Sequence, residues 1–119
     1  MSRYFRTGII AKPVRWLGDS RKAVKGFSAA GRYQAGIELY AVQLGANATD
    51  WKPMRSIGAG ASEIRIHAEN EYRVIYVAKF EDAVYVLHAF TKKTRETSLH
   101  DVRLAQSRYR DMIAQRTAK

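Results

Sequence analysis

The chain has 119 residues and carries 21 lysines and arginines against 11 aspartates and glutamates, a formal net charge of +10. Its 46% hydrophobic residues exclude a disordered chain, and the absence of cysteine excludes a disulfide scaffold, a thiolate nucleophile and a cysteine-ligated metal. We expect one domain over residues 1–119, with an extended lead-in over 1–12 and a folded core over 13–115. No apolar run approaches the length of a membrane-spanning helix and no signal peptide is evident, which favours a cytoplasmic protein without membrane contact.

The core is expected to begin with a short strand and a short helix. Apolar and basic residues alternate over 14–17, which predicts an edge strand. Residues 21–25 predict a short helix whose N-cap is Asp19 or Ser20.

A longer helix is predicted over about 28–44, and it forms a helical hairpin with the first. One apolar stripe recurs every three or four positions along it, and we expect that stripe to face the core: Ala30, Tyr33, Ile37, Tyr40 and Leu44. Residues 46–62 are rich in Gly, Asn, Asp and Pro and predict a loop.

Three strands are then predicted as an antiparallel meander. Residues 63–67 alternate, with the isoleucines on one face and Glu63, Arg65 and His67 on the other. Residues 72–80 are apolar on both faces, which is typical of a central strand, and 83–90 repeat the pattern. A basic connector over 91–97 leads to the clearest helix, which begins with Ser98 and Asp101 in a variant of the capping box.

Most catalytic patterns are absent. His67, His88 and His100 lie on separate elements without the spacing of a metal site, so we expect no metal and no other cofactor. We interpret His88 as a hydrogen-bonded core histidine. Gly58 and Gly60 precede a strand rather than a helix, which argues against a phosphate-binding loop.

Basic side chains on the sheet and at its exit are the remaining candidates. They are Arg65, Arg73, Lys92, Lys93 and Arg95. Strands in a meander lie about 4.8 Å apart, so these cations can converge. Such a cluster would repel itself unless it met an anion, and the phosphate backbone of a nucleic acid is the expected anion. Aromatic residues at alternate strand positions are interpreted as core: Tyr72, Tyr76, Tyr85 and Phe90.

An ordered series of motifs resembles a known family. It consists of Glu-Ile-Arg-Ile over 63–66, Tyr-Arg-Val-Ile-Tyr over 72–76, and a segment over 86–93 that ends in Phe-Thr-Lys-Lys, followed by a helix containing Ala105. Over about residues 12–115 the chain resembles the RelE/HigB superfamily of bacterial toxins. Gln-Leu-Gly over 43–45 and Trp-Lys-Pro-Met over 51–54 resemble its phage-derived, HigB-like branch in particular.

The resemblance implies a RelE-like α+β fold, in which a helical hairpin packs on a small antiparallel sheet with a C-terminal helix. It implies the toxin of a type II toxin–antitoxin system, a metal-independent endoribonuclease that cleaves mRNA on the ribosome and inhibits translation. In that family the RNA 2′-hydroxyl serves as nucleophile, so the resemblance implies that the protein supplies orientation and charge stabilisation. Implied partners are the ribosome, mRNA and a cognate antitoxin, expected to be a helix-turn-helix protein that forms an oligomer with the toxin.

The resemblance also implies roles for individual residues. Arg73 and Lys93 are assigned to charge on the reacting phosphate, and Arg65 to gripping the backbone or assisting proton transfer. Glu63 stands where some relatives have a lysine, and Leu99 lies near the position of a catalytic tyrosine in some. His67 or His100 are candidates to replace those proton-transfer roles. The RNA-binding candidates are Lys52, Lys92 and Arg95.

Two other functions remain open from the sequence. The departures at Glu63 and Leu99 favour a catalytically inactive relative that acts as an RNA- or protein-binding module. The chain could also be a small ribosome-associated or DNA-binding factor. That function would need the C-terminal helix to enter a groove of the nucleic acid, whereas the apolar stripe of this helix is expected to pack on the sheet.

Overall fold

A computed structural model describes residues 10–118, so residues 1–9 of the predicted lead-in over 1–12 lie outside the described range. The elements within the described range are β1 (Val14–Trp16), α1 (Ser20–Lys25), α2 (Ala29–Gln43), β2 (Trp51–Pro53), β3 (Ala61–Ala68), β4 (Asn70–Val77), β5 (Val84–Thr91) and α3 (Leu99–Thr117).

The five strands of the described residues form one sheet in the order β1-β5-β4-β3-β2, parallel between β1 and β5 and antiparallel elsewhere. The predicted meander, with β4 at its centre, is confirmed. The prediction of an unbroken loop over 46–62 is wrong, because β2 lies within it and pairs with β3. A strand of three residues that contains proline has little sequence signal, and proline is tolerated here because β2 is an edge strand.

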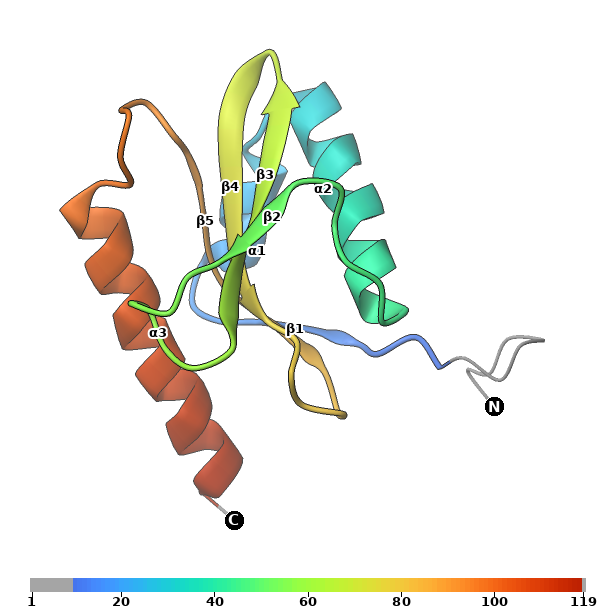
Figure 1. Cartoon of the computed structure of the whole chain (residues 1–119), viewed down its shortest axis with the longest axis vertical. Coiled ribbons are helices and arrows are strands. Elements are labelled where there is room, and N and C mark those ends of the chain that lie inside the picture. The colour runs from blue at the N-terminus through green and yellow to red at the C-terminus, as the bar shows by residue number, and fades with distance from the viewer. Residues whose placement is uncertain (1–9, 119) are drawn as a thin grey trace.

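Helices cover both faces of this sheet, which confirms the α+β class. The α1–α2 hairpin lies on one face and α3 on the other (Figure 1). Alternate residues of β3, β4 and β5 therefore enter two separate apolar layers. The hairpin-side layer contains Ile64, Ile66 and Val74, whereas the α3-side layer contains Ile75 and Leu87.

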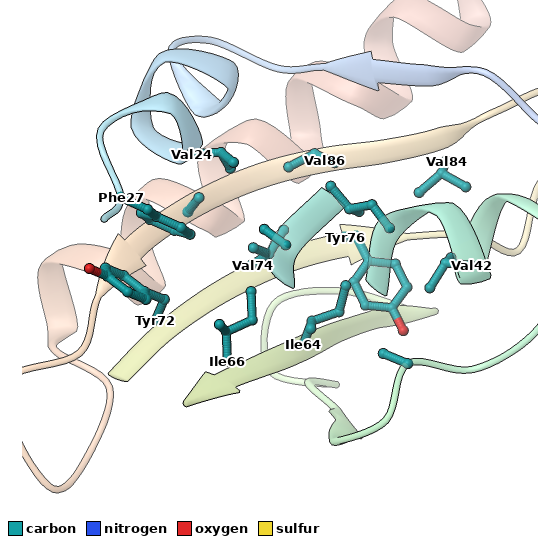
Figure 2. Packing of buried hydrophobic residues seen from close by; sticks show 14 residues of the cluster. Val24, Phe27, Val42, Ile64, Ile66, Tyr72, Val74, Tyr76, Val84 and Val86 are labelled. Carbon is teal, nitrogen blue, oxygen red and sulfur yellow. The ribbon is translucent and has the colours of Figure 1, made fainter. Parts of the chain in front are cut away.

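Tyr72 of β4 lies beside Phe27 at one end of the hairpin-side layer (Figure 2). The ring of Phe27 stacks on the Tyr72 ring with centroids 4.1 Å apart. The Ser28 N–H donates to the Tyr72 hydroxyl over 3.0 Å, and the Ser28 side chain caps α2 by accepting from the Gly31 N–H. A Cβ on Gly31 would lie 2.5 Å from the Tyr72 ring, so α2 needs glycine at this position to approach the sheet.

The predicted orientation of α2 is wrong. Its buried residues are Gly31, Ala35, Glu38, Leu39 and Val42, while Tyr33, Ile37 and Tyr40 of the expected core stripe point to solvent. Both sides of this helix are apolar, so hydrophobic periodicity does not distinguish them. The small residues decide the orientation, because they let the helix backbone come close to the strands.

The second layer holds α3 against β5 and β4, as its apolar stripe predicts. Ala105 and Met112 are fully buried, and the Ser98 side chain accepts from the Asp101 N–H as the predicted cap. The ends of the predicted stripe are solvent-exposed, at Leu99 and Ile113. Asp19 is the N-cap residue of α1, one of the two predicted, but its side chain makes no cap hydrogen bond. Ser20 is buried, and its hydroxyl donates to the Val86 carbonyl.

The hairpin between β3 and β4 turns at Glu69. Glu69 has a φ of 67°, which is unusual for a residue with a side chain. The turn brings His67 opposite Glu71 and Arg65 opposite Arg73. This register places the charged positions of the two strands on one face of the sheet.

Candidate nucleic-acid interface

The α3-side face of β3 and β4 carries a patch of paired charges. Directly opposed residues of an antiparallel pair share a face. Glu63 lies opposite Ile75 of the α3-side layer, so Arg65, His67, Glu71 and Arg73 lie on that face with it. Lys52 of β2 lies opposite Glu63 and joins the same face from the sheet edge. Three of the predicted site residues on the strands, and one predicted RNA contact, are therefore neighbours.

Glu63 occupies the middle of this patch. Its side chain is only 3% exposed, and its Oε2 accepts from the Arg65 Nε over 3.1 Å. Its other oxygen lies 3.9 Å from the Arg73 Nε, and these two atoms are buried with no hydrogen-bond partner among the described residues. The expectation that the cations would repel one another without an external anion is wrong for this pair, because Glu63 is an internal anion between them.

Arg73 is the most enclosed cation of the patch. Its side chain is 7% exposed, and its Nη1 donates to Glu71 Oε1 over 3.1 Å and to the Tyr72 carbonyl over 3.0 Å. Arg65 is partly exposed at the side of the same pair. An approaching anion therefore meets Arg65 before Arg73.

His67 joins two carboxylates at the outer end of the patch. Its Nε2 lies 2.7 Å from Asp50 Oδ2, and its Nδ1 lies 2.8 Å from the Glu71 carboxylate. These hydrogen bonds, that of Asp50 foremost, raise the pKa of His67 above the ordinary value of 6.5. The same hydrogen bonds lower the pKa of Asp50 and of Glu71. Both ring nitrogens donate in the protonated form, so this geometry favours the imidazolium.

The patch is thus a chain of alternating charge. It runs Asp50, His67, Glu71, Arg73, Glu63 and Arg65. Each cation lies between or beside carboxylates, which holds its side chain in one orientation. Such an arrangement can present Arg65 and protonated His67 to a phosphate in fixed positions.

The remaining predicted cations follow β5. The Lys92 N–H donates to the Glu71 carbonyl, which ties the connector to the edge of the patch, and the Lys92 Nζ donates to the Arg95 carbonyl over 2.6 Å. Lys92 and Lys93 line a pocket of about 200 Å³ between the end of β5 and the start of α3. Lys93 and Arg95 are exposed on the connector, and His100 is exposed on the first turn of α3. The histidine candidates His67 and His100 therefore lie on different elements.

His88 is a buried histidine, as predicted. A bulge after Ile75 places both Leu87 and His88 toward α3. The His88 Nε2 lies 2.7 Å from Asp101 Oδ1, and its ring stacks on Phe90 with centroids 5.1 Å apart. This contact ties β5 to the first turn of α3.

Sequence reasoning missed the acidic half of the patch. Asp50 and Glu71 were not candidates, and Glu63 was noted only as a departure from relatives. One signal was available: once the turn is placed at Glu69, positions equidistant from it pair, and they bring charged residues together. No comparable signal links Asp50 to His67, because they are far apart in the chain.

Within residues 10–118, no helix is long and apolar enough to cross a membrane. No group of three or more His, Asp or Glu side chains in that range is placed to hold a metal ion.

Comparison with known proteins identifies the family. No curated protein sequence matches the chain. A family model described as "Phage derived protein Gp49-like (DUF891)" matches residues 22–110, from α1 through most of α3. The chain therefore belongs to the phage-derived Gp49-like family, which is of the RelE/HigB-like toxin type.

Proposed function

We propose that this chain is the toxin of a type II toxin–antitoxin module and that it cleaves mRNA on the ribosome. The observation that carries the proposal is the strand-held patch, in which Glu63 lies between Arg65 and Arg73. Lys52 is exposed on the neighbouring strand β2, and Lys93 is exposed on the connector after β5. Membership of a toxin-type family supports it. The partners in this proposal are the ribosome, mRNA and a cognate antitoxin with a helix-turn-helix domain that forms an oligomer with the toxin.

The proposed reaction uses the RNA as its own nucleophile. The 2′-hydroxyl oxygen gives its proton to a solvent water and attacks the neighbouring phosphorus, the P–O5′ bond breaks, and the 5′ oxygen takes a proton from a histidine. The products are a 2′,3′-cyclic phosphate and a 5′-hydroxyl. Arg65 and Lys93 stabilise the negative charge that develops on the phosphorane. Lys52, Lys92 and Arg95 hold the flanking phosphates, which positions the strand without reading its sequence.

Arg73 and His67 have conditional roles in this reaction. Arg73 contacts the phosphate when an incoming oxygen replaces the exposed Glu71 carboxylate as the partner of Nη1. His67 serves as the acid that protonates the 5′ oxygen, because its hydrogen bonds to Asp50 and Glu71 raise its pKa and favour the protonated form. His100 on α3 is the alternative proton carrier.

The test is a reconstituted translation reaction with purified ribosomes and one defined mRNA, in which new 5′ ends are mapped. We expect cleavage by the wild type, and a loss of about 100-fold or more for Lys93→Ala and for Arg65→Ala. Arg110→Ala, which removes an exposed arginine on α3, is the matched control and should cleave normally. Intact mRNA with the wild type, together with harmless expression in a sensitive host, would overturn the proposal.

A second function is favoured by the enclosure of Arg73. Because its guanidinium already has Glu71 and the Tyr72 carbonyl as partners, the patch resembles a stable binding surface as much as a catalytic one. A non-catalytic RNA-binding module would bind single-stranded RNA with an affinity that falls steeply with salt, and would produce no new 5′ ends in the ribosome assay.

A further inference from the structure

An apolar groove lies on the opposite side of the sheet from the charged patch. It has a volume of about 260 Å³ and runs between α1, α2 and the edge strand β1. Its floor is formed by Val14, Trp16, Val24 and Leu39. Arg21, Lys25 and Arg32 line it as well, and all three side chains are exposed. The groove thus combines an apolar floor with cationic side chains.

The outer face of α2 continues this apolar surface. Tyr33 is 72% exposed, and Ile37 and Tyr40 are about half exposed. Gly36 lies one helical turn from both tyrosines and also lines the groove, so it connects the two surfaces. Arg32 and Glu38 are the charged residues of α2, and Glu38 is buried and accepts from the Thr49 N–H and the Gln34 side chain.

Gly36 has no role that the fold explains. Glycine in the middle of a helix destabilises it by roughly 1 kcal/mol relative to alanine. At position 31 the nearby Tyr72 ring leaves room only for glycine. A Cβ added at Gly36, in contrast, would meet no atom of residues 10–118 within 4 Å outside its own turn of the helix. A bare backbone in the wall of a groove permits another chain to approach closely.

The charge around the groove is one-sided. Among residues 10–118, no acidic side chain forms a salt bridge with Arg21, Lys22, Lys25 or Arg32. The cations of the charged patch, in contrast, have Glu63 and Glu71 beside them. A segment that matches the groove in shape and charge would therefore have apolar side chains flanked by carboxylates.

We propose that the α1–α2 groove binds an acidic amphipathic helix of a protein partner. Aliphatic side chains of that helix enter the groove beside Gly36, and its Asp or Glu residues pair with Arg21, Lys25 and Arg32. A protein segment fits better than RNA, because the mainly aliphatic floor suits apolar side chains, whereas RNA phosphates would meet only the cations that line the groove. The groove lies on the other side of the sheet from the proposed RNA chemistry, so this proposal does not depend on that one.

The test uses the full-length chain and a displayed library of random 16-residue peptides. The library is panned on the wild type with soluble Gly36→Phe as competitor, which removes peptides that bind elsewhere. Gly36→Phe fills the groove from a position where the side chain has open space, and Gly36→Ala is its matched control. Selected peptides are synthesised, and their dissociation constants are measured for the wild type, both glycine variants, Arg21→Glu/Arg32→Glu and Lys93→Ala.

The selected peptides are expected to carry apolar residues at helical spacing, flanked by Asp and Glu. Their affinity should fall about tenfold or more for Gly36→Phe and for Arg21→Glu/Arg32→Glu, and remain unchanged for Gly36→Ala and Lys93→Ala. Failure to recover such peptides, or equal binding to Gly36→Phe, would overturn the proposal. A single-stranded RNA oligonucleotide is tested in parallel. If it loses binding to the same groove variants but not to Lys93→Ala, the groove is an RNA site and the protein-partner proposal is wrong.

Discussion

Replacing Glu63 with alanine removes the anion that lies between Arg65 and Arg73. Arg65 is partly exposed and can regain water, whereas Arg73 is 7% exposed and keeps only Glu71 and a carbonyl as partners. Removing one partner of a buried ion pair destabilises proteins by about 3–5 kcal/mol. We expect the lower end, about 3 kcal/mol, because Arg73 retains one carboxylate.

The measurement is urea unfolding at pH 7 followed by circular dichroism. With an m value of about 1.5 kcal/mol/M, a loss of about 3 kcal/mol lowers the midpoint by about 2 M. Glu71→Ala is the matched control, since it removes a carboxylate from the same arginine, but one that is 46% exposed. That loss should stay below about 1 kcal/mol.

A double-mutant cycle then separates the pair from the rest of the patch. If Glu63 acts on Arg73, the double variant Glu63→Ala/Arg73→Ala should lose less stability than the two single variants combined, by about 1 kcal/mol or more. Equal midpoints for Glu63→Ala and Glu71→Ala, or strict additivity in the cycle, would refute the reasoning that a buried carboxylate orders the patch.

Three further predictions concern the histidine, the two glycines of α2 and the core beneath α3. The raised pKa of His67 implies that the protonated ring stabilises the fold below pH 6.5 and that this stabilisation is lost as the pH rises through the folded-state pKa. In urea titrations, His67→Gln should therefore destabilise the fold more at pH 5.5 than at pH 9. The difference should be at most about 1 kcal/mol, because the side chain is exposed. Gly36→Ala should raise the free energy of unfolding by about 0.5–1 kcal/mol, because alanine favours the helix. Gly31→Ala should lower it, because the new Cβ would lie 2.5 Å from the Tyr72 ring. A change of melting temperature in the same direction for both variants would contradict the packing of α2. Met112→Ala should lose about 2–5 kcal/mol and Ile113→Ala far less, and similar melting temperatures would mean that α3 does not pack as described.

The meander of β3, β4 and β5 and the helix α3 were predictable, because the spacing of their apolar residues fits only one kind of element. Ile64 and Ile66 alternate with charged residues, so the two isoleucines share one apolar layer and the charged residues lie on the opposite face. The helix α2 was predictable in extent but not in orientation, since Tyr33 and Ile37 on one side are as apolar as Ala35 and Leu39 on the other. The contact of Gly31 with the Tyr72 ring, which sets the orientation, is a property of the tertiary structure and leaves no periodic signal.

The candidate site was half predictable for a similar reason. Arg65 and Arg73 stand out as cations on neighbouring strands, and their shared face follows from the hairpin register. The burial of Glu63 and the reach of Asp50 to His67 depend on how the segment before β2 folds against β3. That segment has the composition of a loop, so local patterns do not reveal what it contacts.

The turn at Glu69 has a consequence for how this face could change during evolution. Side chains on a strand alternate strictly, so one residue inserted at this turn would shift the pairing of β3 and β4 by one position. Arg65 would then no longer lie opposite Arg73, and on one of the two strands the charged residues would turn toward the layer that holds Tyr72. Insertions of two residues would preserve the faces while sliding the charges past one another. Among natural variants of this hairpin, length changes of two residues should therefore be tolerated more readily than changes of one.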